Sequence, residues 1–462
     1  MNLRGDSRWK AFVDKRKKIG VLIGIGAVLV APSSAFAVTL EEALSSLLAN
    51  HPNIRAASKN IASARAGIDK AEAGFLPKVN VLSATGPELV DSPGTRSSES
   101  GKESNLRKTT ASVTVTQNLY NGGATTSATK QARLSKSAQE AKADDTTQQI
   151  LMEGVKAYID VLRQLQLVEL AAQNEETIQI QLNLEDERVQ KGSGIAVDVL
   201  QAKSRLQLSK ERRVRFEGAL EDAFTRYTQA FNVAPQIDKL NEPMPSSDLL
   251  PDSLEAAINV ALSENPQLQQ TDRQVAVARE KKAGAGFDLM PNIDIVGKMG
   301  YESDNAATEG TRRDMSVVLQ ANWDLFSGFS SRANVAQASY DYAASRDTYD
   351  YTIRKTVENV RLAWQKLKTS RERLALLENA VNIASEVFES RKKLRSAGKE
   401  TVINVLDAET EISNARINFA TASFDEREAL YGLLLSMGRL TLPELEVSAE
   451  GAGDAIPGDT LR

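Results

Sequence analysis

The sequence predicts a mixed fold in which long α-helices are joined to short β-strands, with every part present in two copies. Three observations support this prediction. Short motifs recur in the same order in the two halves of the chain, two long stretches lack proline, and four segments of about ten residues alternate between apolar and polar side chains. Together they indicate two helical hairpins that carry strands of membrane length.

Residues 1–37 have the pattern of a secretory signal peptide. A basic segment at 4–18 precedes an apolar run at 19–30, and the small residues Ala35 and Ala37 follow. The apolar run is shorter than the roughly 20 residues that a membrane-spanning helix needs. We therefore expect the segment to be cleaved on export.

The composition excludes several classes of function. The chain has no cysteine, which excludes disulfides, thiol catalysis, cysteine-ligated metal and a lipid anchor on an N-terminal cysteine. Its formal net charge of −4 gives no support for nucleic-acid binding. Its carboxylates are scattered over predicted helix faces without a pocket-forming pattern, so we expect no enzyme, no metal and no cofactor.

The only histidine is expected to have a structural role. His51 precedes Pro52, and its counterpart in the second copy is Asn265 before Pro266. A catalytic base or metal ligand should not be interchangeable with asparagine. We therefore expect His51 to break or cap the first helix.

Two copies of one unit account for most of the chain. The paired segments, in order, are 39–43 with 253–257, 50–54 with 264–268, 77–81 with 291–295, 118–122 with 324–328, and 199–202 with 405–408. We expect a first repeat at 38–232, a linker at 233–251, a second repeat at 252–438 and a partly disordered tail at 439–462.

Each repeat is predicted to contain one long helical hairpin. Residues 94–234 and 292–442 contain no proline and are rich in helix-forming residues. A helix from 124 to 191 would be about 100 Å long, so such helices must pack side by side. Glycine turns at 191–194 and 396–399 interrupt the two stretches and mark the hairpin tips.

Four alternating segments precede the long helices and have the length of tilted strands that cross a bilayer. Their clearest alternation falls at 78–81, 111–116, 292–301 and 315–323. The aromatic residues at strand ends, where a membrane girdle would lie, are Tyr120, Tyr301, Trp323 and Phe326. Soluble β-hairpins with one solvent-exposed face would show the same alternation of apolar and polar side chains. Export, strand length and terminal aromatics favour the membrane interpretation.

The ends of these strands have different compositions. Segments 86–108 and 302–314 are polar and are predicted to be external loops. The opposite ends enter the helices through short turns, whose residues are Asn121, Gly122, Gly123, Ser327 and Gly328. Four strands cannot close a barrel, for which the known minimum is about eight. A dimer would give a barrel filled by side chains, whereas a trimer would give twelve strands and a lumen.

The doubled order of helix, strand pair, Leu-Tyr-Asn-Gly-Gly, long helix, glycine turn and Val-x-Val-Leu-x-Ala resembles the TolC family of outer-membrane efflux and secretion channels. The resemblance covers 39–445 and is to the cysteine-free, non-lipoprotein type. It implies a homotrimeric, twelve-stranded transmembrane β-barrel, with four strands per chain, continuous with a long periplasmic α-helical barrel.

The resemblance also implies a function and partners. The protein would be the exit duct of a tripartite export system in the outer membrane of a Gram-negative bacterium. It would bind a periplasmic adaptor (membrane fusion) protein and outer-membrane lipid, and would receive small molecules or proteins from an inner-membrane RND or ABC transporter. The alternative is a periplasmic helical scaffold without a channel, which would share the helices but would not need strands of bilayer length.

The resemblance further implies a constriction at the periplasmic end of the pore. Relatives carry two acids just after the second glycine turn, and the matching positions here are Asn404 and Asp407. The first copy offers Asp198 and Gln201. Closely spaced carboxylates around a threefold axis would attract cations. Acids in the first turn of a helix would equally complement its dipole.

Two further expectations follow from the resemblance. Relatives close the periplasmic end with a tyrosine and an arginine that reach the acid aligned with Asp198. The aligned positions are Arg395, which can form such a gate link, and Glu400, which cannot. In relatives the hairpin tips meet the adaptor, which implies docking by Lys191, Gly192, Ser193, Ala397, Gly398 and Lys399, although glycine is also required there by the turn alone.

Overall fold

The computed structural model describes residues 40–97, 104–192, 194–243 and 249–442. The predicted signal peptide, Ser193 and most of the predicted tail lie outside the described residues. None of the described helices combines the length and apolar composition that crossing a membrane requires.

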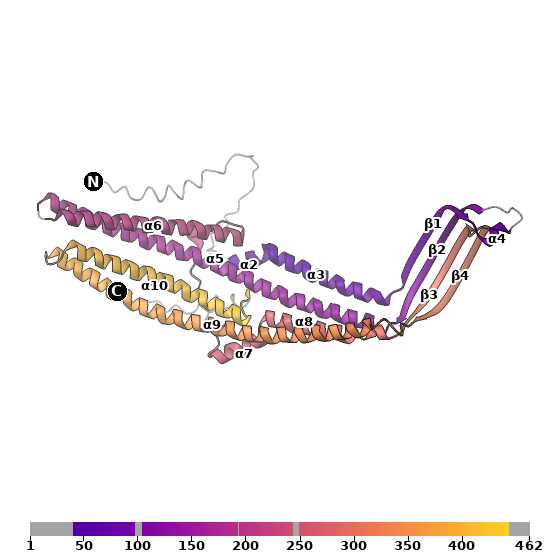
Figure 1. Ribbon diagram of the computed structural model, residues 1–462. Coiled ribbons are helices and arrows are strands. Elements are labelled where there is room, and N and C mark those ends of the chain that lie inside the picture. Colours follow the sequence, from indigo (N-terminus) through magenta and orange to yellow (C-terminus); the bar gives the residue numbers. More distant parts are fainter. Residues whose placement is uncertain (1–39, 98–103, 193, 244–248, 443–462) are drawn as a thin grey trace, which may run out of the picture. The chain divides into compact units, whose positions relative to one another are not determined.

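The same order of elements occurs twice along the chain (Figure 1). The first series is α2 (Leu40–Asn50), α3 (Pro52–Glu72), β1 (Lys78–Val90), β2 (Ser104–Tyr120), α5 (Ala124–Gln190) and α6 (Ala196–Phe231). The second series is α7 (Leu254–Glu264), α8 (Pro266–Gly284), β3 (Asn292–Asn305), β4 (Thr308–Asn322), α9 (Ser330–Ser396) and α10 (Val402–Met437). A short helix, α4 (Pro93–Arg96), lies between β1 and β2.

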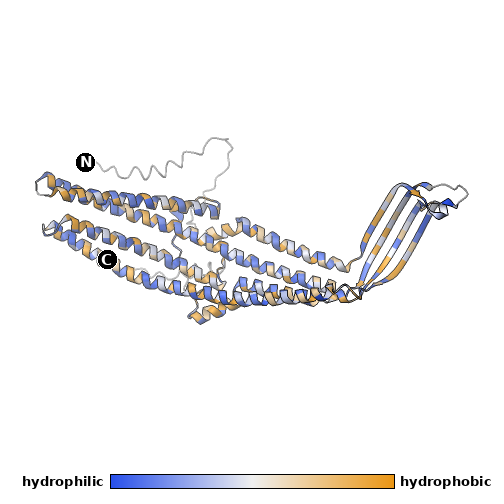
Figure 2. Ribbon diagram, viewed as in Figure 1, coloured by the Kyte–Doolittle hydropathy of each residue, from blue (hydrophilic) through white to orange (hydrophobic). Residues whose placement is uncertain are grey.

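The long helices form two antiparallel hairpins that pack against each other. Both α5 and α9 contain 67 residues, a length of about 100 Å. Helix α6 returns along α5 and α10 returns along α9, while α10 also packs against α5. Polar and apolar residues are mixed along the whole length of these helices (Figure 2). The predicted helical hairpins are therefore confirmed. Each long helix buries only one stripe of side chains along its length.

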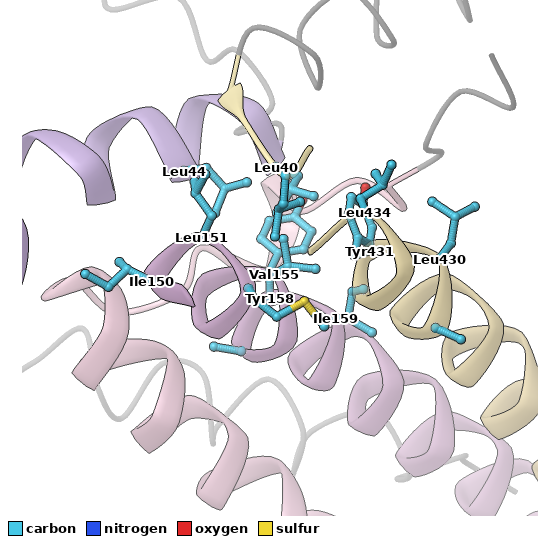
Figure 3. Packing of buried hydrophobic residues seen from close by; sticks show 14 of the residues in the cluster. Leu40, Leu44, Ile150, Leu151, Val155, Tyr158, Ile159, Leu430, Tyr431 and Leu434 are labelled. Carbon is cyan, nitrogen blue, oxygen red and sulfur yellow. The ribbon is translucent and has the colours of Figure 1, made fainter. Parts of the chain in front are cut away.

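The main core lies where the hairpins meet the short helices α2 and α7. Tyr158, Tyr431 and Leu434 are almost completely buried there (Figure 3). The Tyr158 hydroxyl donates to the Asn241 carbonyl at 2.9 Å and accepts from the Asn241 N–H at 3.0 Å. Burial raises the pKa of Tyr158 to about 12, so this hydroxyl remains protonated and holds the linker against α5.

The four strands form one antiparallel sheet in the order β1-β2-β3-β4. The register places Val81 beside Val113, Val113 beside Met299, and Met299 beside Met315. All four side chains of this row are exposed, so one face of the sheet presents an apolar surface. Large exposed apolar surfaces mark membrane or protein contacts. The strands β1 and β4 are the edges of the sheet in the described part of the chain.

The predicted loops between strands were too long. Strand β1 continues to Val90, β2 begins at Ser104, and only two residues separate β3 from β4. Polar cross-strand pairs explain the extension, because Lys108 Nζ donates to Glu88 Oε1 at 2.9 Å in the segment where the apolar alternation has ended. The strands therefore reach 13 to 17 residues.

The prediction that His51 caps a helix is confirmed. Its Nδ1 atom accepts a hydrogen bond from the Asn53 N–H at 3.3 Å, at the N-terminus of α3. In the second copy, Asn265 Oδ1 accepts from the N–H groups of Gln267 and Leu268 at the N-terminus of α8. The two residue types thus satisfy free backbone donors in the same way.

Candidate functional site

The turns between strands and helices lie at one end of the long helices. In the first copy, Asn121 Nδ2 donates to Thr125 Oγ1 at 2.6 Å, and Gly122 and Gly123 have positive φ angles. In the second copy, the hydroxyls of Ser327 and Ser331 lie 3.0 Å apart, and Gly328 is followed by Phe329 with a φ of 67°. Both turns occur where the sequence predicted them.

The opposite ends of the helices are the two hairpin tips. Gly192 follows Lys191 at the end of α5, with a φ of 78°, and Gly398 follows Ala397 at the end of α9, with a φ of 72°. The Lys399 N–H reaches back to the Leu394 carbonyl at 3.0 Å, which closes the last turn of α9. The left-handed conformation explains glycine at both tips, and the predicted turns are confirmed.

An apolar cluster joins the two tips. Ile178 and Leu182 of α5, Val199 and Leu206 of α6, and Leu406 of α10 are buried together. The tip of the first hairpin therefore packs on the start of α10. This packing brings several charged side chains of the two hairpins together.

The first of these is Arg395, near the end of α9. Its guanidinium donates to Glu185 of α5 and to the Glu400 carbonyl, the latter at 2.9 Å. Glu185 is only 3% exposed, so its carboxylate depends on this partner. The candidate gate residue Arg395 thus connects α9, the turn before α10 and the other hairpin, but its carboxylate partner is Glu185 and not the expected Asp198.

Glu400 and Asn404 interact with each other at the start of α10. The Asn404 amide donates to the Glu400 carboxylate, which also accepts from the Thr401 N–H at 3.0 Å. The Asn404 hydrogen bond is the main cause that lowers the pKa of Glu400. A second acid at 404 would repel Glu400, which gives a local reason for the amide.

Asp407 pairs across the hairpins with Arg205 of α6. The Arg205 Nη2 to Asp407 Oδ1 distance is 2.7 Å, and both side chains are about half exposed. One heptad further along the same two helices, Arg212 Nη1 donates to Asn414 Oδ1 at 2.9 Å. The repeated spacing indicates that α6 and α10 pack in coiled-coil register.

The candidate residues of the first copy are arranged differently. Asp198 is buried in the first turn of α6, whereas Gln201 is exposed one turn later. No side chain caps the N-terminus of α6, and an acid in its first turn complements the helix dipole.

Sequence reasoning missed Glu185 and Arg205. A signal for Glu185 exists, because the apolar stripe of α5 runs through Ile178, Leu182 and Val189 and continues through Glu185. An acid at such a position needs a partner from another helix. Arg205 carries no comparable signal, since its side chain is about half exposed and lies outside the apolar stripe of α6.

No group of three acidic, histidine or cysteine side chains in the described residues is placed to hold a metal ion. The charged groups at the tips are instead distributed as pairs between helices. Ion pairs between the hairpins can hold them together, and breaking these pairs would let the hairpins separate. The exposed carboxylates can attract cations that pass between the hairpins.

The model of the outer membrane efflux protein family matches this chain twice, at 43–233 and 257–439. The chain belongs to that family. The outer membrane efflux protein model covers both hairpins and all four strands, so the predicted family and fold class are confirmed.

Individual members of the family are similar over much of their length. The alkaline protease secretion protein AprF of Pseudomonas aeruginosa is 26% identical over 68% of this chain and 66% of its own length. The outer membrane protein TolC of Vibrio cholerae is 24% identical over 95% of this chain and 98% of its own length. The solved CmeC outer membrane channel of Campylobacter jejuni is 14% identical, with a TM-score of 0.75 over 91% of this chain and 94% of its own.

The family membership assigns a coarse function to this arrangement. As an outer membrane efflux protein, the chain is a subunit of an exit duct in the outer membrane of a Gram-negative bacterium, with a helical extension into the periplasm. The family is one of channels rather than enzymes. The scaffold alternative leaves the exposed apolar face of the sheet unexplained.

Proposed function

We propose that three copies of this chain form one channel with no catalytic activity, and that its helical end receives cargo from an inner-membrane RND or ABC transporter through a periplasmic adaptor. The exposed apolar face of the four-stranded sheet carries this proposal. A face of that kind is stable against lipid, and four strands need partner copies to close a barrel. Three chains supply twelve strands, enough to leave a lumen.

The cargo of such a duct depends on the transporter that feeds it. Relatives include proteins named for protease secretion and proteins named for efflux. We therefore propose that small molecules or proteins pass through this channel. The glycine tips, at 191–193 and 397–399, are the surfaces proposed to meet the adaptor.

The periplasmic constriction is proposed to carry Asp407, Asn404, Asp198 and Gln201. Asp407 is the strongest candidate, because its carboxylate is half exposed at the end of α10 nearest the tip. Its partner Arg205 offsets part of its charge, and a half-exposed pair of this kind contributes only about 0–1 kcal/mol. The carboxylate thus stays available to a passing cation.

Conductance of the reconstituted channel in planar bilayers tests whether the three copies of Asp407 line the pore. Asp407→Asn is expected to weaken block by a multivalent cation about tenfold, because three carboxylates are lost around one axis. Arg205→Gln is expected to strengthen the block, since it leaves Asp407 without its counter-charge. Glu378→Gln, which removes an exposed acid of α9 further from the tips, is the control and should behave as wild type. Unchanged block in Asp407→Asn would show that this residue does not line the pore.

A further inference from the structure

A cavity of about 340 Å³ lies between α5, α9 and α10, further from the tips than the Asp407 pair. Its lining is largely polar and includes Asn174 of α5, Glu409 and Ser413 of α10, and Glu389 and Lys392 of α9. No part of the proposed constriction or docking surface uses these residues. The cavity therefore needs a separate explanation.

Two buried side chains connect the hairpins across this cavity. Asn174 Nδ2 donates to Glu409 Oε1 at 2.9 Å, and the two residues are 5% and 6% exposed. Asn174 belongs to the first hairpin and Glu409 to the second. This contact is thus the buried counterpart of the exposed Arg205–Asp407 pair, but it joins α10 to α5 rather than to α6.

Ser413 lies one turn after Glu409, on the same face of α10. It is 5% exposed, and its hydroxyl has no hydrogen-bond partner. Buried polar groups are normally paired, so an unpaired hydroxyl in the lining of the cavity that also holds Glu409 needs an explanation. A carboxylate can only accept hydrogen bonds, whereas a carboxylic acid both donates and accepts.

The charges around Glu409 come from two helices. Lys392 of α9 forms an ion pair with Glu389 at 3.6 Å, and Arg416 of α10 lines the same cavity, while α5 contributes only uncharged residues to the lining. Burial raises the pKa of Glu409, and the Asn174 hydrogen bond and the two basic groups oppose this effect only in part. Glu389 adds to the rise.

We propose that Glu409 is a proton-controlled link between the two hairpins: its protonated form holds α10 against α5, and its ionisation loosens that contact. This proposal rests on the proposed function in one respect, because it assumes that the two hairpins line a duct. Its geometry depends on the chain alone, since Asn174, Glu409 and Ser413 all belong to one protomer.

The direction of the effect follows from the burial of the carboxyl group. When α10 moves away from α5, water reaches Glu409 and its pKa returns to the ordinary range of an exposed glutamate. The packed arrangement consequently binds the proton more tightly than the separated one. It is fully stabilised below that ordinary range, and the stabilisation is lost as the pH rises through the raised pKa of the packed form. Acid conditions should hold the hairpins together.

Hydrogen exchange of the assembled wild-type protein between pH 5 and pH 8 tests this link. After correction for the intrinsic pH dependence of exchange, opening of the segment 402–420 should increase at least about fivefold toward pH 8, the lower end of typical coupling between a ligand and a conformational change. Glu409→Gln cannot ionise and should keep the low opening at every pH. Asn174→Asp places a second acid beside Glu409 and should move the transition to higher pH.

The matched control is Glu411→Gln, which removes an exposed acid from the same helix and should follow the wild type. An identical pH dependence in wild type and Glu409→Gln would overturn the proposal. The outcome is independent of channel activity: a pH-dependent opening in a protein that does not conduct would retain the link and reject the proposed duct. If the protein conducts and Glu409→Gln leaves the pH dependence of opening unchanged, the proposed duct is retained and the link is rejected.

Discussion

Replacing Arg395 with alanine is expected to separate the two hairpin tips and to increase the conductance of the channel. The guanidinium is the observed partner of Glu185, which is 3% exposed. Removing one partner of a buried ion pair leaves the other charge without compensation, at a cost of about 3–5 kcal/mol. The free-energy cost of Arg395→Ala should fall at the lower end of this range, because the Arg395 side chain retains 20% exposure.

The expected readouts are a longer open time in planar bilayers and greater uptake of large antibiotics by cells. Lys393→Ala is the matched control, because it removes an exposed basic side chain from the same turn of α9. The double variant Arg395→Met with Glu185→Leu replaces the ion pair with apolar groups, and it should restore the conductance of the wild type. Wild-type conductance of Arg395→Ala would show that this pair does not hold the tips.

The second large effect is expected at the end of α10, where Gly438→Ala should strongly destabilise the protein. Gly438 has a φ of 84°, and a Cβ atom there would lie 2.7 Å from the Asn265 Cα atom. The left-handed conformation costs a non-glycine residue about 1–2 kcal/mol. The backbone contact adds about 1–3 kcal/mol, because neither chain segment can move aside easily.

Several interactions hold that junction in place. Gln148 Nε2 donates to the Gly438 carbonyl at 2.6 Å, and Arg439 binds both carboxylate oxygens of Glu264 at 2.7 and 2.8 Å. A displacement of Gly438 would disturb these contacts as well. The prediction is therefore a loss of about 3 kcal/mol, seen as a lower midpoint of thermal unfolding of the assembled protein.

The first copy supplies a control for this substitution. Asn232 ends α6 as Gly438 ends α10, and it has a φ of 56°. Asn232→Gly should change stability by only a few tenths of a kcal/mol, because asparagine already tolerates this conformation. Equal unfolding midpoints for Gly438→Ala and the wild type would contradict the steric account.

The sequence predicted those parts of the fold that depend on local signals. The absence of proline over 94–234 and 292–442 indicated the helical hairpins, and glycine marked both tips. The alternation of side chains located all four strands, although it underestimated their length. Polar pairs such as Lys108 with Glu88 extend the strands beyond the apolar pattern, and such pairs are visible only once the register is known.

The partners of the candidate site residues could not be predicted in the same way. Arg205 and Asp407 lie on different hairpins, and their contact depends on the packing register of α6 against α10. The same holds for Arg395 with Glu185, although an acid in the apolar stripe of α5 was a detectable warning. The resemblance to the TolC family indicated where the site lies, whereas packing determines which charges meet.

Copies of this chain are proposed to assemble in the outer membrane into a conducting channel. The most direct test is to isolate the wild-type protein from outer-membrane fractions, determine its mass without heating, and record its conductance in planar bilayers. We expect a trimer that dissociates on heating and conducts ions. Recovery of a monomer from the soluble periplasm, with no conductance after reconstitution, would contradict it.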